Sequence, residues 1–137
     1  MIELDVIAYL DADAQLTALL GASASDSKIY PIQKPLSSSI PYIVYNIASE
    51  GTNEENLLEM IISFECVDDV YKDLINISDR LYELLDIQDD AQNKIDSSDY
   101  YIYWCKVTSG RETKDTEIYN FHKTLDVSIK YHRKSRW

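Results

Sequence analysis

The first 20 residues have the hydrophobic pattern of helical structure. Gly21 is typical of a helix end, and Asp11 or Asp13 can cap a second helix after a break. The pattern predicts one kinked helix or two short ones between residues 2 and 20. Apolar side chains recur there at intervals of three to four positions, as on one face of an α-helix: Ile2, Val6, Tyr9, Leu10, Leu16, Leu19 and Leu20.

The next pattern predicts a short strand followed by a hairpin. Residues 22–41 are rich in Ser and Pro and read as a loop, with a short strand only at Lys28–Pro31. Residues 42–48 are β-branched and aromatic, and residues 58–66 alternate apolar with polar side chains. We expect these two strands to form a hairpin around Gly51–Asn56.

The second half of the chain repeats the order of helix and hairpin. Asp68 and Asp69 can cap a helix that runs to about Asp86 on an apolar stripe, and the polar residues 88–99 predict an exposed loop. Strands are expected at 100–108 and 119–131, joined by residues 109–118. The fold class is therefore α+β: two principal helices on one face of a mainly antiparallel sheet of four to five strands.

Length and composition limit the class of protein. A chain of 137 residues with 45% hydrophobic residues fits one domain, residues 1–137. Its apolar runs are far shorter than the roughly 20 residues that span a bilayer, and Glu3 and Asp5 replace the basic start of a secretory signal. We expect no membrane span and a cytoplasmic location during synthesis.

The charge is strongly acidic but unevenly distributed. The net charge is −11, which argues against nonspecific DNA binding by the body of the protein. Residues 123–137 hold five basic residues and one acidic residue. We expect residues 133–137 to form a basic C-terminal tail, which is either a plain solvated terminus or a contact to an acidic surface.

No pattern of catalytic or metal-binding residues is present. Cys66 and Cys105 lack zinc-site spacing and read as buried hydrophobic residues, and His122 and His132 read as surface residues. Neighbouring carboxylates fall in expected loops or caps. No GxSxG motif occurs, and three isolated glycines cannot form a phosphate loop. We expect no cofactor, no metal and no enzymatic activity.

Tyrosine is the outlier of the composition, with 11 copies against two of Phe. Tyrosine is enriched at protein interfaces. The aromatic residues of YYIYWC (100–105) would occupy both faces of a strand, so either the protein's own helices or self-assembly must cover them. The candidate interface residues are Tyr42, Tyr45, Tyr101, Tyr103 and Tyr119, with Arg111 and Lys114 near the second hairpin tip and Arg133, Lys134, Arg136 and Trp137 in the tail.

The order of segments resembles that of a known family. The segments are DVIAYLDADAQLTALLG (5–21), IYP followed by PYIVY (29–31 and 41–45), SFECVDDVYKDLINISDRLYELLD (63–86) and HKTLDVSIKYHR (122–133). Together they resemble the tail-completion or tail-terminator proteins of long-tailed bacteriophages, the lambda U-like group. The spacer QKPLSSSI and the acidic segment after the second helix depart from the family pattern.

The resemblance implies a structural role in a virion. It implies a homo-oligomeric ring of six copies that caps the tail tube protein, stops tube growth and contacts head connector or neck proteins. DNA would pass through the acidic lumen without specific binding. Two other readings stay open: a head-completion or connector stopper protein, and an acidic inhibitor that mimics DNA.

Overall fold

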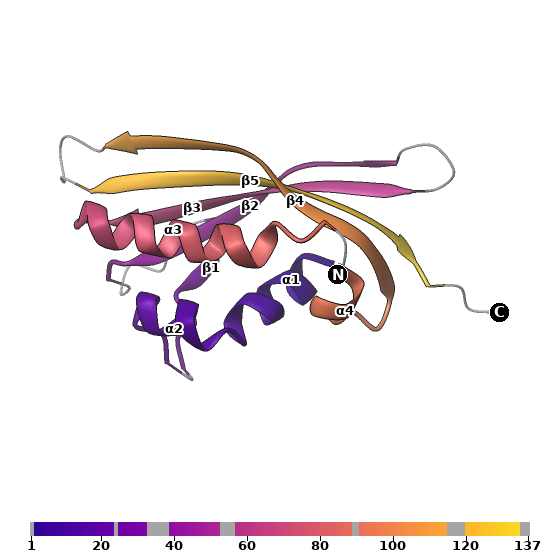
Figure 1. Ribbon diagram of the computed structural model, residues 1–137, viewed down its shortest axis with the longest axis horizontal. Coiled ribbons are helices and arrows are strands. Elements are labelled where there is room, and N and C mark those ends of the chain that lie inside the picture. The colour runs from indigo at the N-terminus through magenta and orange to yellow at the C-terminus, as the bar shows by residue number, and fades with distance from the viewer. Residues whose placement is uncertain are drawn as a thin grey trace.

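The structure, a computed structural model, is an α+β fold in which helices cover one face of a five-stranded sheet (Figure 1). It describes residues 2–23, 25–32, 39–52, 57–88, 91–114 and 120–134. The elements in chain order are α1 (Ile2–Asp11), α2 (Ala14–Leu20), β1 (Ile29–Pro31), β2 (Tyr42–Thr52), β3 (Leu58–Asp68), α3 (Tyr71–Leu85), α4 (Ala91–Lys94), β4 (Tyr100–Lys114) and β5 (Phe121–Arg133).

The N-terminal pattern forms two helices, the second of the two alternatives. Asp13 adopts an extended conformation at the break, and its Oδ2 accepts a hydrogen bond from the backbone N–H of Leu16 at 2.8 Å. This bond satisfies an amide that the start of α2 would otherwise leave free. Gly21 ends α2 in the left-handed conformation, with φ 65°, which glycine adopts without a steric penalty.

The sheet has the strand order β1-β2-β3-β5-β4. β1 pairs with β2 in parallel, and the other three pairs are antiparallel. The sheet is therefore mixed, which refines the expectation of a mainly antiparallel one. Its two hairpins point to opposite ends, because Leu58, beside the β2–β3 tip, pairs with Tyr131, whereas Asp68 pairs with Phe121, beside the β4–β5 tip.

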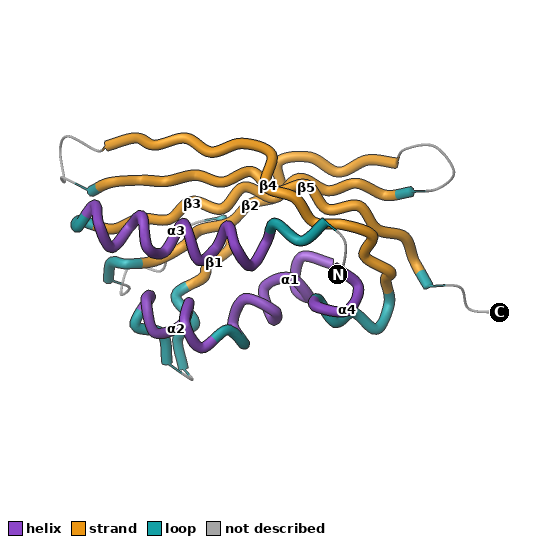
Figure 2. The backbone as a smooth tube through the Cα atoms, viewed as in Figure 1, coloured by secondary structure: helices purple, strands orange, loops and turns teal. Residues whose placement is uncertain are grey.

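The core lies between the sheet and the helices, which share one side of it (Figure 2). The predicted alternation of β3 is confirmed, since Ile62 and Phe64 are fully buried whereas their neighbours Ile61 and Ser63 are not. Residues from α3 that fill the core include Leu74, Ile77, Leu81 and Leu85. Both cysteines are buried, as expected, and burial raises the pKa of the Cys66 thiol to about 12, so this thiol stays protonated at neutral pH.

Three local predictions were wrong. β4 continues to Lys114 where a connection was expected from residue 109. The segment expected as an exposed loop contains α4, and Ile95 after it is 1% exposed. Val70, and neither Asp68 nor Asp69, occupies the N-cap position of α3. Asp68 Oδ1 instead accepts from the backbone N–H of Val70 at 3.2 Å.

Within the described part of the chain, no helix has the length and apolar character needed to cross a membrane.

Candidate interaction surface

The face of the sheet opposite the helices carries no described element (Figures 1 and 2). Its members alternate along each strand with the core residues, because neighbouring side chains point to opposite faces. We call this surface the open face. It comprises Tyr42, Val44 and Asn46 of β2, Glu59, Ile61, Ser63 and Glu65 of β3, Tyr101, Tyr103, Trp104, Lys106, Ser109 and Arg111 of β4, and Thr124, Asp126, Ser128, Lys130 and His132 of β5.

Asp126 lies at the centre of the open face and links three strands. Its carboxylate accepts hydrogen bonds from Ser63 Oγ of β3, from Ser109 Oγ of β4 at 2.8 Å and from Arg111 Nη1 at 3.0 Å. These donors, the hydroxyl of Ser63 above all, hold the pKa of Asp126 below its usual range, because they stabilise the ionised form. The carboxylate of Asp126 is thus already satisfied by partners on the face itself.

The end of the open face near the C-terminus is aromatic and basic. The His132 ring lies 5.2 Å from the ring of Tyr101 and 4.9 Å from that of Tyr103, measured between centroids. Lys134 Nζ lies 5.2 Å from the centre of the Tyr101 ring, and Lys130 Nζ lies 4.6 Å from that of Trp104. Both contacts are of the cation–π type.

A bulge in β4 explains this clustering. The pairing between β4 and β5 shifts between Ile102 and Trp104, so Tyr103 is an extra residue. Tyr101 and Tyr103 remain 46% and 49% exposed, whereas Tyr100 turns to the helix side and contacts the ring of Tyr131 at 5.3 Å. The expectation that this segment has aromatic residues on both faces is confirmed.

Two of the other candidate residues lie on the open face and one does not. Tyr42 is half-buried there, and burial raises the pKa of its hydroxyl. Arg111 belongs to the Asp126 cluster, with its side chain 60% exposed. Tyr45, by contrast, lies in the core at 8% exposure, against Phe64. The surface positions of β2 alternate with its core positions, and Tyr45 occupies a core position. The expectation that Tyr45 lies at an interface was therefore wrong.

Two residues of the expected basic tail, Arg133 and Lys134, lie in the described part of the chain. Arg133 is the last residue of β5. Lys134 is anchored, since its backbone N–H donates to Asp99 O at 2.9 Å and its Nζ donates to Ser97 O at 2.8 Å. Lys114 stands over the Phe121 ring at 5.4 Å. Tyr119, Arg136 and Trp137 lie outside the described residues.

The sequence reasoning missed the two residues that organise the open face. His132 was read only as a surface residue, and Asp126 was not singled out. The signal was present in the polar alternation of Asp126, Ser128, Lys130 and His132. Pairing that alternation with β3 and β4 would have placed Ser63 and Ser109 beside Asp126, because directly opposite residues share a face.

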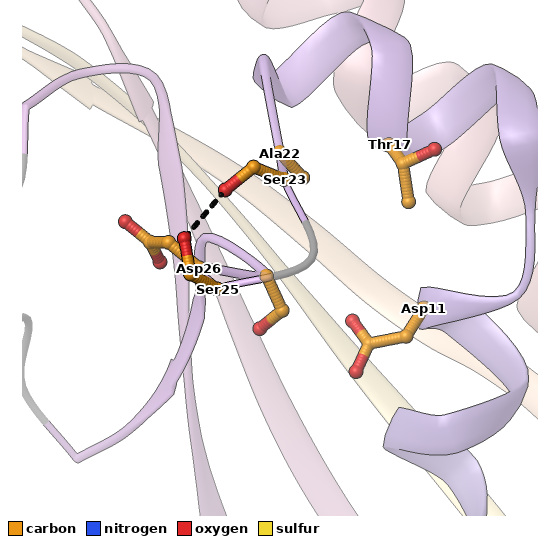
Figure 3. A pocket seen from close by; sticks show the side chains of 7 residues that line it. Asp11, Thr17, Ala22, Ser23, Ser25 and Asp26 are labelled. Carbon is orange, nitrogen blue, oxygen red and sulfur yellow. Dashed lines mark hydrogen bonds between the residues drawn. The ribbon is translucent and has the colours of Figure 1, made fainter.

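A separate pocket lies beside α1, α2 and the segment that follows them (Figure 3). Its described lining consists of two carboxylate residues, four hydroxyl residues and one alanine: Asp11, Thr17, Ala22, Ser23, Ser25, Asp26 and Ser27. The carboxylate of Asp26 already accepts from Tyr30 Oη at 2.6 Å and from the backbone N–H of Lys28 at 3.0 Å. Across the described ranges, no three His, Cys, Asp or Glu side chains are grouped to hold a metal ion.

Comparison with known proteins yields a structural likeness without a sequence likeness. No family model matches the sequence, and no curated protein matches it either. A solved structure does match: a chain from the "Virion of native gene transfer agent (GTA) particle", with a TM-score of 0.63 and 13% sequence identity. The match covers 94% of this chain and 92% of that one. At this identity the likeness shows that the two chains share a fold.

Proposed function

We propose that this chain is a structural protein of a phage-like virion, which forms a ring of six copies on the end of the tail tube. There it stops tube polymerisation and presents a surface for head–tail joining. The observation that carries the proposal is the fold shared with a chain of a virion particle along nearly the full length of both. The order of segments, which resembles the tail-terminator family, supports the specific position in the tail.

The charge of the chain fits a ring around DNA. Six copies, each with a net charge of −11, give a strongly negative assembly. Phosphates passing through its lumen would be repelled and would release no counterions on contact. DNA would therefore traverse the lumen without specific binding. The protein would be made in the host cytoplasm and then reside in the virion.

The aromatic and basic end of the open face fits a protein contact. Tyr101 and Tyr103 expose about half of their surface beside Lys130 and Lys134, while most of the chain is acidic. Aromatic residues are enriched at interfaces and often dominate their energy. This end therefore suits an acidic or mixed surface on a tube or neck protein. It fits a DNA mimic poorly, because such a mimic would present carboxylates.

The test is co-sedimentation with tail tubes from the virus or element that encodes the chain. The variant Tyr101→Ser plus Tyr103→Ser should bind tubes at least about tenfold more weakly than the wild type. The matched control, Tyr71→Ser, removes a tyrosine of similar exposure, 45%, from α3, away from the open face. The control should bind as the wild type does.

The same assay separates the alternatives. Undiminished tube binding by a folded Tyr101/Tyr103 variant would contradict the proposed contact. Binding to isolated portal complexes and not to tubes would assign the chain to the head connector. We propose no catalytic role, and turnover that follows the purified protein and disappears with a single carboxylate substitution would overturn that part of the proposal.

A further inference from the structure

Each edge of the sheet is blocked to pairing with a further strand over part of its length. At the β1 edge, Ser27 Oγ lies 3.3 Å from both the backbone N and O of Ile29, and Pro31 has no N–H to donate. At the β4 edge, the backbone of Cys105 exchanges two hydrogen bonds with Ile87, and Val107 N–H donates to Asp86 Oδ1 at 3.3 Å. These contacts prevent strand pairing at those places.

Among the described residues, the rest of each edge has no strand paired with it. β1 pairs with residues 43–45 of β2, and just beyond this pairing the N–H of Ile32 donates to Tyr45 O at 2.8 Å. Within the described ranges, no backbone hydrogen bond reaches the outer edge of β2 over residues 46–51, or that of β4 over residues 108–113. An edge strand with free N–H and C=O groups is a template for pairing with another strand.

The two open stretches are complementary in position. The β2 stretch lies toward the β2–β3 tip and the β4 stretch toward the β4–β5 tip, at opposite ends and on opposite edges (Figure 1). β2 and β4 run antiparallel within the sheet. Two copies displaced along the strand direction can therefore bring the β2 stretch of one beside the β4 stretch of the other. β1 of the first copy and Ile87 of the second then lie outside the paired region and do not block it.

The side chains next to these stretches also match. A groove between α3 and the open part of β4 has an apolar part formed by Tyr82, Val107, Gly110 and Leu125. The rest of its lining is polar or charged: Ser78, Asp79, Thr108, Ser109 and Lys123. A Cβ on Gly110 would lie 3.2 Å from Leu125 Cδ2, so glycine keeps the groove open. On β2, Ile47 is paired with the core residue Ile62 and thus faces the helix side, yet it is 37% exposed. A β2 strand added to β4 would carry this apolar side chain over the groove.

We propose that the β2 stretch 46–51 of one copy pairs antiparallel with the β4 stretch 108–113 of the next, so that the sheet continues from copy to copy. The contact is head-to-tail, because it joins two different surfaces, and its repetition gives a closed ring or a filament. Closure into a ring rests on the proposed function. All helices then lie on one side of the continuous sheet, and the open faces lie on the other.

Disulfide trapping tests this pairing. Thr113 and Ser49 both lie on the side of the open face, and neither side chain makes a hydrogen bond to another described residue. Within one copy, β3 and β5 separate the two strands by about 14 Å, and a disulfide needs Cα atoms within about 7 Å. A bond between the two positions therefore joins different copies. The native cysteines are buried and give little background.

The variant Thr113→Cys is combined in turn with Asn46→Cys, Ser49→Cys and Gly51→Cys, which sample three registers on one face. Mild oxidation is carried out at a concentration where the wild type associates, or on tail tubes. At least one pair should give a ladder of disulfide-linked oligomers, which disappears on reduction and ends at a single closed species. Each single-cysteine variant should give no ladder. A dimer from Thr113→Cys alone, or no ladder from any pair, would contradict the proposal.

A second variant avoids new cysteines. Ile47→Asp should weaken self-association about tenfold or more, since it replaces the apolar side chain over Val107 and Leu125 with a charged one, and the monomer should still fold. The control is Leu4→Asp, an exposed apolar residue of α1 at 55% exposure, which should associate normally. Tube capping without a ladder would overturn the edge pairing alone. A ladder without tube capping would overturn the proposed function alone.

Discussion

At the scale of single residues, Asp13 joins two elements of the helical layer. Its carboxylate accepts from Leu16 N–H at the start of α2, and from Arg80 of α3 through Nε at 3.0 Å and Nη2 at 2.6 Å. The two guanidinium bonds form a bidentate pair, which fixes geometry better than a single bond. One side chain thus caps α2 and orients it against α3.

We predict that Asp13→Ala lowers the free energy of unfolding by about 1–2 kcal/mol through the lost cap alone. Urea denaturation measures this change. Asp11→Ala is the matched control, because Asp11 is an exposed carboxylate in the preceding turn, and it should leave the midpoint nearly unchanged. Equal midpoints for wild type and Asp13→Ala would show that the cap contributes nothing.

The same carboxylate predicts a loss of stability in acid. The hydrogen bond from Arg80 lowers the pKa of Asp13, and the one from Ser63 lowers the pKa of Asp126. Each group has a folded-state pKa below the unfolded value of about 3.9, so the stabilisation is present above pH 4 and is lost as the pH falls through the folded pKa. Unfolding midpoints at pH 7 and pH 3 should therefore differ more for the wild type than for Asp13→Asn plus Asp126→Asn.

At the scale of elements, β5 contains one polar group that its surroundings do not satisfy. The Ser128 side chain is 2% exposed, and its Oγ has no hydrogen-bond partner within the described structure. A buried hydroxyl without a partner costs free energy. Ser63, on the same face, has the opposite situation, because its Oγ is bonded to Asp126.

We predict that Ser128→Ala raises the free energy of unfolding by up to about 1 kcal/mol, whereas Ser63→Ala lowers it by a similar amount. Chemical denaturation of the two variants side by side checks both signs. If Ser128→Ala destabilises the chain as much as Ser63→Ala does, the hydroxyl of Ser128 has a partner in solution and the account of β5 is wrong.

The type and order of most elements followed from the sequence, whereas their ends did not. β3 was predictable because one face is buried, so its apolar residues alternate. The extension of β4 over residues 109–114 was not, because both faces there are exposed and the polar side chains leave no alternation. α4 has only four residues, too few for a helical period to register in the pattern.

The candidate site was predicted in composition and only partly in position. Tyr101 and Tyr103 were candidate interface residues, and both are about half exposed on the open face. Tyr45 was placed on the wrong side because the run at 42–48 is apolar at both phases, so its facing cannot be read from one strand alone. The contact between His132 and the tyrosines depends on the register of β5 with β4 and on the bulge at Tyr103, which local sequence does not specify.

At the scale of the whole molecule, three features of the surface occur together. Among the described residues, helices cover one face of the sheet and no element covers the other, and each edge is paired or blocked over only part of its length. One end of the open face carries exposed aromatic residues beside basic ones, in a chain that is acidic as a whole. A monomer has no need of this combination, because exposed edges and aromatic clusters invite association. A ring subunit that touches identical copies at its edges and a different protein at its open face would use all three.

The most direct test of this account is electron microscopy of tail tubes polymerised from purified tube protein with and without this chain. The account predicts that the chain halts elongation and that one end of each tube carries a ring with sixfold density. Tubes that elongate at the same rate in its presence, with bare ends, would contradict the central claim.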